Sequence, residues 1–213
     1  MEAKTGYEAE LQNWVSKERA TVSLINSVGT LMYDQGVELV FFRNQLVDLG
    51  VNEVLNLFDY ADNVVLKHID AHTAAKVAKV MRSMDLAPSK IDIGKLTKQY
   101  LLEKSDHADI GAFLSTTLSN FIGKDKHRFE PRDVVLYGFG RIGRLAAREL
   151  IKQAGKGQQL RLRAIVTRNT SDEQIIKRAA LLRNDSVHGT FNGTVQSDLK
   201  NKRLIVNGQI IEM

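Results

Sequence analysis

Three glycines with the spacing Gly138-x-Gly140-x-x-Gly143 form the segment whose residue types point most directly to a ligand. They follow the short apolar run Val134–Tyr137 and precede a segment with helical periodicity. A glycine turn of this kind brings a ligand's phosphates to the free N–H groups and positive dipole of a helix N-terminus. Glycine triplets also arise by chance, and a turn without a ligand is the alternative. The position between a strand and a helix favours a dinucleotide-binding turn.

The elements that must position this turn have clear patterns. The run Val134–Tyr137 is continuously apolar, which predicts a strand buried on both faces. The remaining expected elements are a helix over Ile142–Gln153, a strand over Leu160–Thr167, a helix over Asp172–Leu182 capped by Ser171, and short strands near Gly193–Ser197 and Arg203–Val206. Asn207-Gly208 is a hairpin-turn dipeptide. A strand–helix–strand order of this length predicts an α/β fold with a partial Rossmann-type, doubly wound parallel sheet over residues 131–213.

The first 130 residues have helical patterns, which predict an all-helical extension over residues 1–130. Helices are expected over residues 7–33, 51–60, 61–85, 91–103 and 108–122, with Asn52 as a cap. The apolar block 37–47 is expected to close as a helix, with Gly50 as its C-terminal residue. A polar segment, Gly123–Arg132, carries the second of only two prolines and predicts a linker between two domains.

Composition sets further bounds. Hydrophobic residues make up 43% of the 213, and neither a membrane-length apolar run nor a basic leader with an apolar core is visible, so we expect a cytoplasmic protein. Residues 133–213 hold 14 basic and 7 acidic residues, which suits a phosphate-bearing partner. A solvated basic face or nucleic-acid binding are alternatives, but no nucleic-acid motif accompanies the charge. The chain has no cysteine, which excludes disulfides, thiolate metal sites and cysteine nucleophiles.

Two other clusters suggest chemistry only superficially. Asp185, Ser186 and His188 lie within four residues on one turn, whereas catalytic triads are usually assembled from separated elements. His68 and His72 have metal-ligand spacing on an expected helix, but the glutamate of an H-E-x-x-H motif is absent. We therefore predict neither catalysis nor a metal site at these positions.

Three motifs together resemble one enzyme family. Tyr137-Gly-Phe-Gly-Arg-Ile-Gly-Arg144, Leu182-Arg-Asn-Asp-Ser-Val-His-Gly-Thr-Phe191 and Ile205-Val-Asn-Gly208 occur in the order and spacing of the N-terminal part of glyceraldehyde-3-phosphate dehydrogenase. The resemblance covers about residues 133–213. The preceding residues resemble the helical extension of a longer bacterial form.

The resemblance implies a set of cofactor-binding residues: Gly138, Phe139, Gly140, Arg141, Ile142, Gly143, Arg168, Asn169 and Thr170. The backbone N–H groups of Arg141 and Ile142 would face the pyrophosphate. The family usually has Asn-Asp after the second strand, and its carboxylate holds the adenine ribose. Here the pair is Asn169-Thr170, which leaves NAD and NADP equally open as the cofactor.

The family oxidises a phosphorylated aldehyde, usually glyceraldehyde 3-phosphate, through a cysteine thioester in glycolysis and gluconeogenesis, and it assembles as a tetramer. Because this chain has no cysteine, we expect it to be an incomplete part of such an enzyme, without turnover or normal cofactor affinity alone. A non-catalytic nucleotide-binding or regulatory protein is the alternative. For residues 1–130 we expect a docking or assembly role.

Overall fold

A computed structural model describes residues 2–63, 65–66, 68–123, 131–153 and 160–213. The chain divides into two compact units, Met1–His127 and Arg128–Met213. Each unit is described by itself below. Most of the expected linker, residues 124–130, lies outside the described residues.

The N-terminal unit is built around a long helix, α1 (Glu2–Thr30). It continues as one turn of π-helix, Leu31–Gln35, and ends at Gly36, whose φ of 73° is one that glycine adopts without strain. The second half of α1 packs on α3 (Ala71–Arg82). The helix expected over residues 7–33 is therefore confirmed.

A three-stranded sheet is the part of this unit that the sequence pattern did not predict. β1 (Val37–Phe41) pairs antiparallel with β2 (Asn44–Gln45) and parallel with β3 (Ser89–Asp92). The expectations of an all-helical region and of a helix over residues 37–47 are therefore wrong in this respect. A short apolar run does not distinguish a buried strand from a buried helix. Phe42 and Arg43, both with positive φ, make the turn between β1 and β2.

Four further helices complete the unit: α2 (Val51–Asn63), α3, α4 (Ile93–Glu103) and α5 (Ile110–Thr117), with a single 3-10 turn over Lys104–Asp106. Asp70, Asp92 and Asp109 each accept a hydrogen bond from the backbone N–H three residues on, which fixes where α3, α4 and α5 begin. The expected helix 61–85 is wrong at its start, because α3 begins only after its cap, Asp70.

Gly50 and Asn52 have roles that differ from those expected. The backbone N–H of Gly50 donates to the carboxylate of Glu53, and the carbonyl of Gly50 accepts from Val54. Gly50 therefore stands at the start of α2 and does not end a helix. Asn52 lies inside the first turn and is not the cap. The glutamate supplies the reciprocal bond of a capping box.

The core of the N-terminal unit is continuous across helices and sheet. Its largest fully buried side chains include Leu24, Leu31, Leu39, Phe41, Leu46, Met81 and Phe113. Burial of apolar side chains from every layer stabilises the unit as one body.

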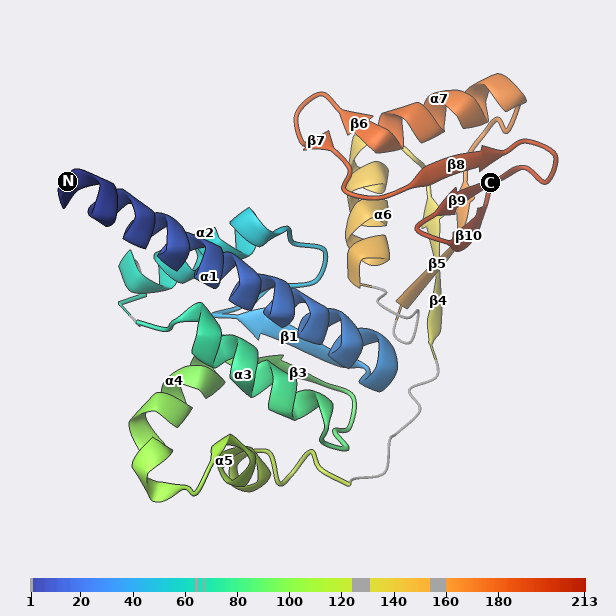
Figure 1. Ribbon diagram of the computed structural model, residues 1–213. Coiled ribbons are helices and arrows are strands. Elements are labelled where there is room, and N and C mark those ends of the chain that lie inside the picture. Colours follow the sequence, from blue (N-terminus) through green and yellow to red (C-terminus); the bar gives the residue numbers. More distant parts are fainter. Residues whose placement is uncertain (1, 64, 67, 124–130, 154–159) are drawn as a thin grey trace. The chain divides into compact units, whose positions relative to one another are not determined.

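The C-terminal unit contains a five-stranded sheet in the order β4-β5-β10-β9-β8 (Figure 1). The strands are β4 (Arg132–Tyr137), β5 (Leu160–Val166), β8 (Val195–Asp198), β9 (Arg203–Val206) and β10 (Gln209–Glu212). β4, β5 and β10 are parallel, and β10, β9 and β8 form an antiparallel meander. Asn207 and Gly208 have φ of 47° and 77°, so the expected hairpin turn is confirmed.

Two helices accompany this sheet, α6 (Arg141–Gln153) and α7 (Asp172–Arg183). A small hairpin of β6 (Asn184–Asp185) and β7 (Gly189–Thr190) follows α7. The expected strand–helix–strand order is confirmed to within about two residues at each boundary, and the mixed α/β class with it.

One face of the sheet is covered and the other is open. Side chains of α6 and α7 share one core cluster with Leu162, Ile165, Leu204 and Ile211. On the opposite face of β4, Val135 is 58% and Tyr137 is 91% exposed. The expectation that this strand is buried on both faces is therefore wrong for the described residues. The apolar side chains on the open face of β4 are of a kind that a second layer would normally cover. Among the described residues, however, both α6 and α7 lie on the other face of the sheet.

Two kinds of feature are absent from the described residues. No helix among them is long and apolar enough to cross a membrane. No group of three or more histidine and carboxylate side chains is arranged to hold a metal ion in that part of the chain.

Candidate dinucleotide site

The glycine turn links the end of β4 to the start of α6. The backbone N–H of Gly138 donates to the carbonyl of Val166 at 2.8 Å, which ties the turn to the end of β5. Gly138 has a φ of 94°, a conformation that side-chain-bearing residues rarely adopt. A Cβ on Gly143 would lie 2.5 Å from the Gly138 carbonyl oxygen, so glycine is needed for this close packing. Phe139 is buried in the core and anchors the turn.

The open side of the turn fits a phosphate group. A Cβ built on Gly140 meets no atom within 4 Å, so this glycine leaves space next to the backbone. The first helical hydrogen bond runs from the Arg144 N–H to the Gly140 carbonyl at 3.0 Å. The N–H groups of Arg141, Ile142 and Gly143 therefore have no intrahelical acceptor. Free donors, the positive end of the helix dipole and unfilled space beside Gly140 together suit an anion.

The end of β5 supplies a second group of polar residues. The side-chain oxygen of Asn169 accepts from the Ser171 N–H at 2.8 Å, and the backbone carbonyl of Asn169 accepts from Arg178 and from the Thr167 hydroxyl. Ser171 is the N-cap of α7, as expected, but its own hydroxyl makes no capping bond. Thr170 lies between them and is half-buried, and Arg168 is exposed. The expected residues therefore lie at the two strand ends that β4 and β5 bring together in parallel.

Charges beside Thr170 are partly neutralised. Asp172, in the first turn of α7, forms an ion pair with Lys202. Arg178, further along α7, reaches back to the backbone carbonyl of Asn169. The carboxylate nearest to Thr170 thus carries its own counter-ion, which reduces repulsion of a second anion there.

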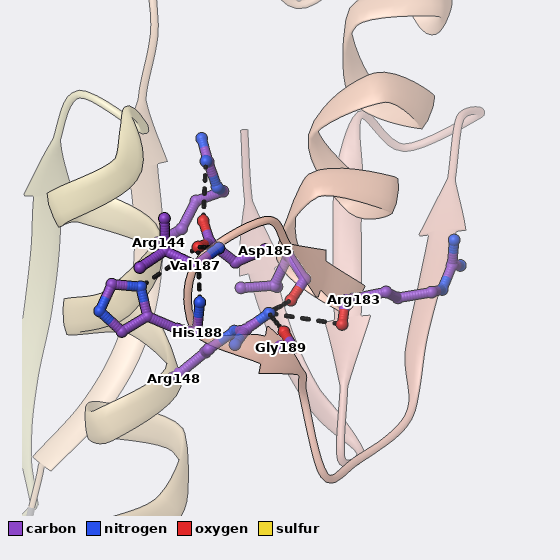
Figure 2. Close-up of polar contacts among 8 residues, drawn as sticks. Arg144, Arg148, Arg183, Asp185, Val187, His188 and Gly189 are labelled. Atoms are coloured by element: carbon purple, nitrogen blue, oxygen red, sulfur yellow. Dashed lines mark hydrogen bonds and ion pairs between the residues drawn. The ribbon is translucent and has the colours of Figure 1, made fainter.

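A network of arginines holds the hairpin that follows α7 (Figure 2). Arg148, on α6, is buried and donates to the carbonyls of Leu182, Arg183 and Gly189. Arg144, one turn earlier, forms an ion pair with the buried carboxylate of Asp185 at 3.3 Å. α6 therefore carries the glycine turn at its N-terminus and fixes the 184–190 segment along its length.

Asp185 organises this hairpin and does not form a triad. Its carboxylate accepts from the N–H groups of Val187 and His188 and from the His188 ring, and these bonds hold the pKa of the Asp185 carboxyl well below its usual range. Ser186 makes no hydrogen bond to His188 within the described structure. The role of Arg148 could not be predicted from the sequence, because its partners lie 34 to 41 residues away. The only signal was a second arginine four residues after Arg144.

His68 and His72 do not come together as ligands. His68 lies outside any helix and pairs with Asp62 at 3.1 Å. His72 is on α3, and its ring contacts the Ser16 hydroxyl at 3.3 Å. The expected helix that would have carried both is interrupted between Asn63 and Ala71.

A parallel β-α-β unit with a glycine turn at the N-terminus of its first helix defines a dinucleotide-binding fold of the Rossmann type. Residues 132–213 match the family model of the glyceraldehyde 3-phosphate dehydrogenase NAD-binding domain. Residues 132–213 are therefore similar to the NAD-binding domain of the glyceraldehyde-3-phosphate dehydrogenase family, and this match confirms the resemblance stated from the motifs.

Individual relatives agree with this. A glyceraldehyde-3-phosphate dehydrogenase-like protein of Pseudomonas aeruginosa is 35% identical over 193 residues, which cover 89% of this chain and 42% of that protein. Glyceraldehyde-3-phosphate dehydrogenases of Monascus purpureus and Zymomonas mobilis are 40% and 36% identical over 79 and 81 residues. These matches cover 37% and 36% of this chain, and 21% and 22% of the two relatives. The Pseudomonas match includes most of the N-terminal unit, and the chain spans about two fifths of that relative.

Proposed function

We propose that this chain supplies the cofactor-binding part of a dehydrogenase that oxidises a phosphorylated aldehyde with hydride transfer to NAD or NADP. The observation that carries the proposal is the open N-terminus of α6 beside Gly140, within a domain of this family. The bound cofactor would accept the hydride. Residues of this chain would hold the pyrophosphate at the N–H groups of Arg141 and Ile142, and the adenine ribose near Asn169 and Thr170.

The chemistry of acyl transfer needs a nucleophile that this chain does not contain. The family forms a thioester on a cysteine, and none of the 213 residues is cysteine. On this proposal the chain binds and orients the cofactor, and the thiol comes from outside these residues. The same absence favours, as a second candidate, a non-catalytic dinucleotide-binding role for the chain itself.

The residues around Thr170 support use of both cofactors. An aspartate at this position would accept from the 2′-hydroxyl of NAD and repel the 2′-phosphate of NADP. Thr170 removes the repulsion, and the hydroxyls of Thr170 and Ser171 with the exposed Arg168 offer donors to a phosphate. Pairing of Asp172 with Lys202 also reduces the repulsion between the Asp172 carboxylate and a bound phosphate.

Binding of NAD and NADP to the chain, measured by saturation-transfer NMR, tests this function because that method detects weak binding. We expect both cofactors to bind, with dissociation constants within about tenfold of each other. Thr170→Asp should weaken NADP binding and strengthen NAD binding, and Arg168→Ala should weaken NADP binding alone. NAD binding that is much tighter than NADP binding, and a ratio unchanged by Arg168→Ala, would contradict dual use.

An assay of dehydrogenase activity distinguishes the dehydrogenase from the non-catalytic dinucleotide-binding protein. The product of the gene that encodes these residues would be assayed with glyceraldehyde 3-phosphate, phosphate and each cofactor. Formation of reduced cofactor supports the dehydrogenase. Cofactor binding without any turnover of this aldehyde or of erythrose 4-phosphate would favour the non-catalytic candidate.

A further inference from the structure

The first half of α1 carries an apolar stripe that no other described residue covers. Every residue from 6 to 17 is exposed, and the buried face of the helix begins only at Ala20, Thr21 and Leu24. Figure 1 shows the first turns of α1 lying beyond the other elements of its unit. The exposed apolar side chains are Tyr7, Leu11, Trp14, Val15 and Val22.

These five side chains lie on one face of the helix, which they share with one charged residue, the half-buried Glu18. At 3.6 residues per turn they fall within a sector of roughly 100°, the width of a stripe that normally packs against a partner. Tyr7 is 71% and Trp14 is 46% exposed. A short helical end without tertiary contacts is marginal in water, so a projecting helix of this kind gains stability when its apolar face is covered.

The charges that flank the stripe are self-complementary. Glu10 and Lys17 lie along one flank, and Glu8 and Arg19 lie along the other. In an antiparallel helix pair, flanks of the same side face each other. Glu10 would then lie opposite Lys17 of a second copy, and Glu8 opposite Arg19, in a single register. A parallel pair would instead bring Glu8 towards Glu10 and Lys17 towards Arg19.

We propose that α1 pairs antiparallel with α1 of a second copy of this chain, so that residues 7–22 form a two-helix interface. The register set by the charges brings the two Trp14 side chains to the centre and Leu11 against Trp14 and Val15 of the second copy. Aromatic side chains concentrate binding energy in such interfaces. The acidic Glu8 and Glu10 beside the stripe disfavour an anionic membrane surface as the occupant. This interface is independent of the dinucleotide site.

Sedimentation velocity of the full chain over a range of concentrations tests the interface. We expect reversible dimerisation with a dissociation constant on the order of 10 µM. Leu11→Glu should weaken it at least about tenfold, because a charge would be buried in the seam. Ala9→Glu adds the same charge about 160° away, on the opposite face of the same exposed part of the helix, and should leave the dimer unchanged. Circular dichroism checks that all variants remain folded.

Charge exchange tests the orientation. Glu10→Lys and Lys17→Glu should each weaken the dimer by roughly three- to tenfold, and the double variant should restore wild-type affinity. In a parallel pair each single variant would strengthen the dimer. The proposal is overturned by that result, by a wild-type chain that stays monomeric, by a dimer insensitive to Leu11→Glu, or by a monomer that binds phosphatidylcholine vesicles through this stripe.

Discussion

The guanidinium of Arg148, on α6, donates to the backbone carbonyl of Leu182, at the end of α7, over 2.7 Å. The same side chain reaches the carbonyls of Arg183 and Gly189, and it lies over the ring of Phe191. A buried cation thus satisfies the acceptors that a helix leaves free at its C-terminus, where the helix dipole also favours positive charge. One side chain couples the helix of the glycine turn to the end of the next helix.

Replacement of Arg148 should therefore destabilise the C-terminal unit. We expect Arg148→Met to lower the free energy of unfolding by about 2–4 kcal/mol, because the buried Leu182 carbonyl and the Gly189 carbonyl lose this charged donor. Urea denaturation measures this. Arg161→Met is the matched control, since Arg161 pairs with Asp133 at the surface and should cost less than about 1 kcal/mol. Equal losses in the two variants would contradict the argument.

The carboxylate of Asp185 should make stability depend on pH. Its pKa in the folded chain is lowered from the ordinary 3.8 by the N–H groups of Val187 and His188. A lowered pKa means that the charged form is preferred in the folded state, so the stabilisation is complete above the unfolded pKa and declines as pH falls below about 4. Asp185→Asn should thus be less stable than wild type at pH 7, with a difference that shrinks between about pH 4 and pH 2.

Urea midpoints for both proteins across that pH range check this prediction. Asp133→Asn, which removes an exposed carboxylate in place of a buried one, serves as the control. A difference between wild type and Asp185→Asn that is constant with pH would show that Asp185 does not titrate with a lowered pKa.

Substitutions at the second and third glycines of the turn should have different effects, one on cofactor binding and the other on folding. Gly143→Ala places a Cβ 2.5 Å from the Gly138 carbonyl oxygen, so we expect a loss of about 1–3 kcal/mol in the free energy of unfolding. Gly140→Ala meets no neighbouring atom and should change stability by less than about 0.5 kcal/mol. It should nevertheless abolish the NMR binding signal of NAD, because the Cβ occupies the space proposed for the pyrophosphate.

Much of the C-terminal unit could be predicted because its signals are local. The helix and strand periods, the glycine turn and the Asn207-Gly208 dipeptide each depend on neighbouring residues. Exposure of Val135 and Tyr137 could not be predicted, since burial of a strand face depends on what covers it. The contacts of Arg148 were missed for a related reason, because its acceptors are far away in the sequence.

The N-terminal unit shows the limit of apolar patterns more directly. Residues 37–47 are apolar enough for either a strand or a helix, and pairing of Val37–Phe41 with Ser89–Asp92 decides between them. That pairing partner lies some fifty residues away and has little strand character of its own. The starts of α3, α4 and α5, by contrast, follow from aspartates at the cap positions, and these aspartates are visible in the sequence.

Asp92 takes part in a local interaction, as the cap of α4, and in a long-range one, with the end of β1. Its Oδ1 accepts from the Lys95 N–H, which caps α4, and from the Phe42 N–H, which ties the end of β1 to the end of β3. Asp92→Ala should lower the free energy of unfolding by about 2 kcal/mol, the upper end for loss of a cap, because a second donor also loses its acceptor. Asp92→Asn keeps an acceptor oxygen and should recover part of the loss.

Asp109 provides the comparison, because among the described residues its carboxylate accepts only from the Ala112 N–H, as the cap of α5. Asp109→Ala should cost about 1 kcal/mol. Hydrogen exchange distinguishes the roles further, since loss of Asp92 should speed exchange at β1 as well as in the first turn of α4. Exchange that increases in α4 alone would mean that the bond to Phe42 contributes nothing to the sheet.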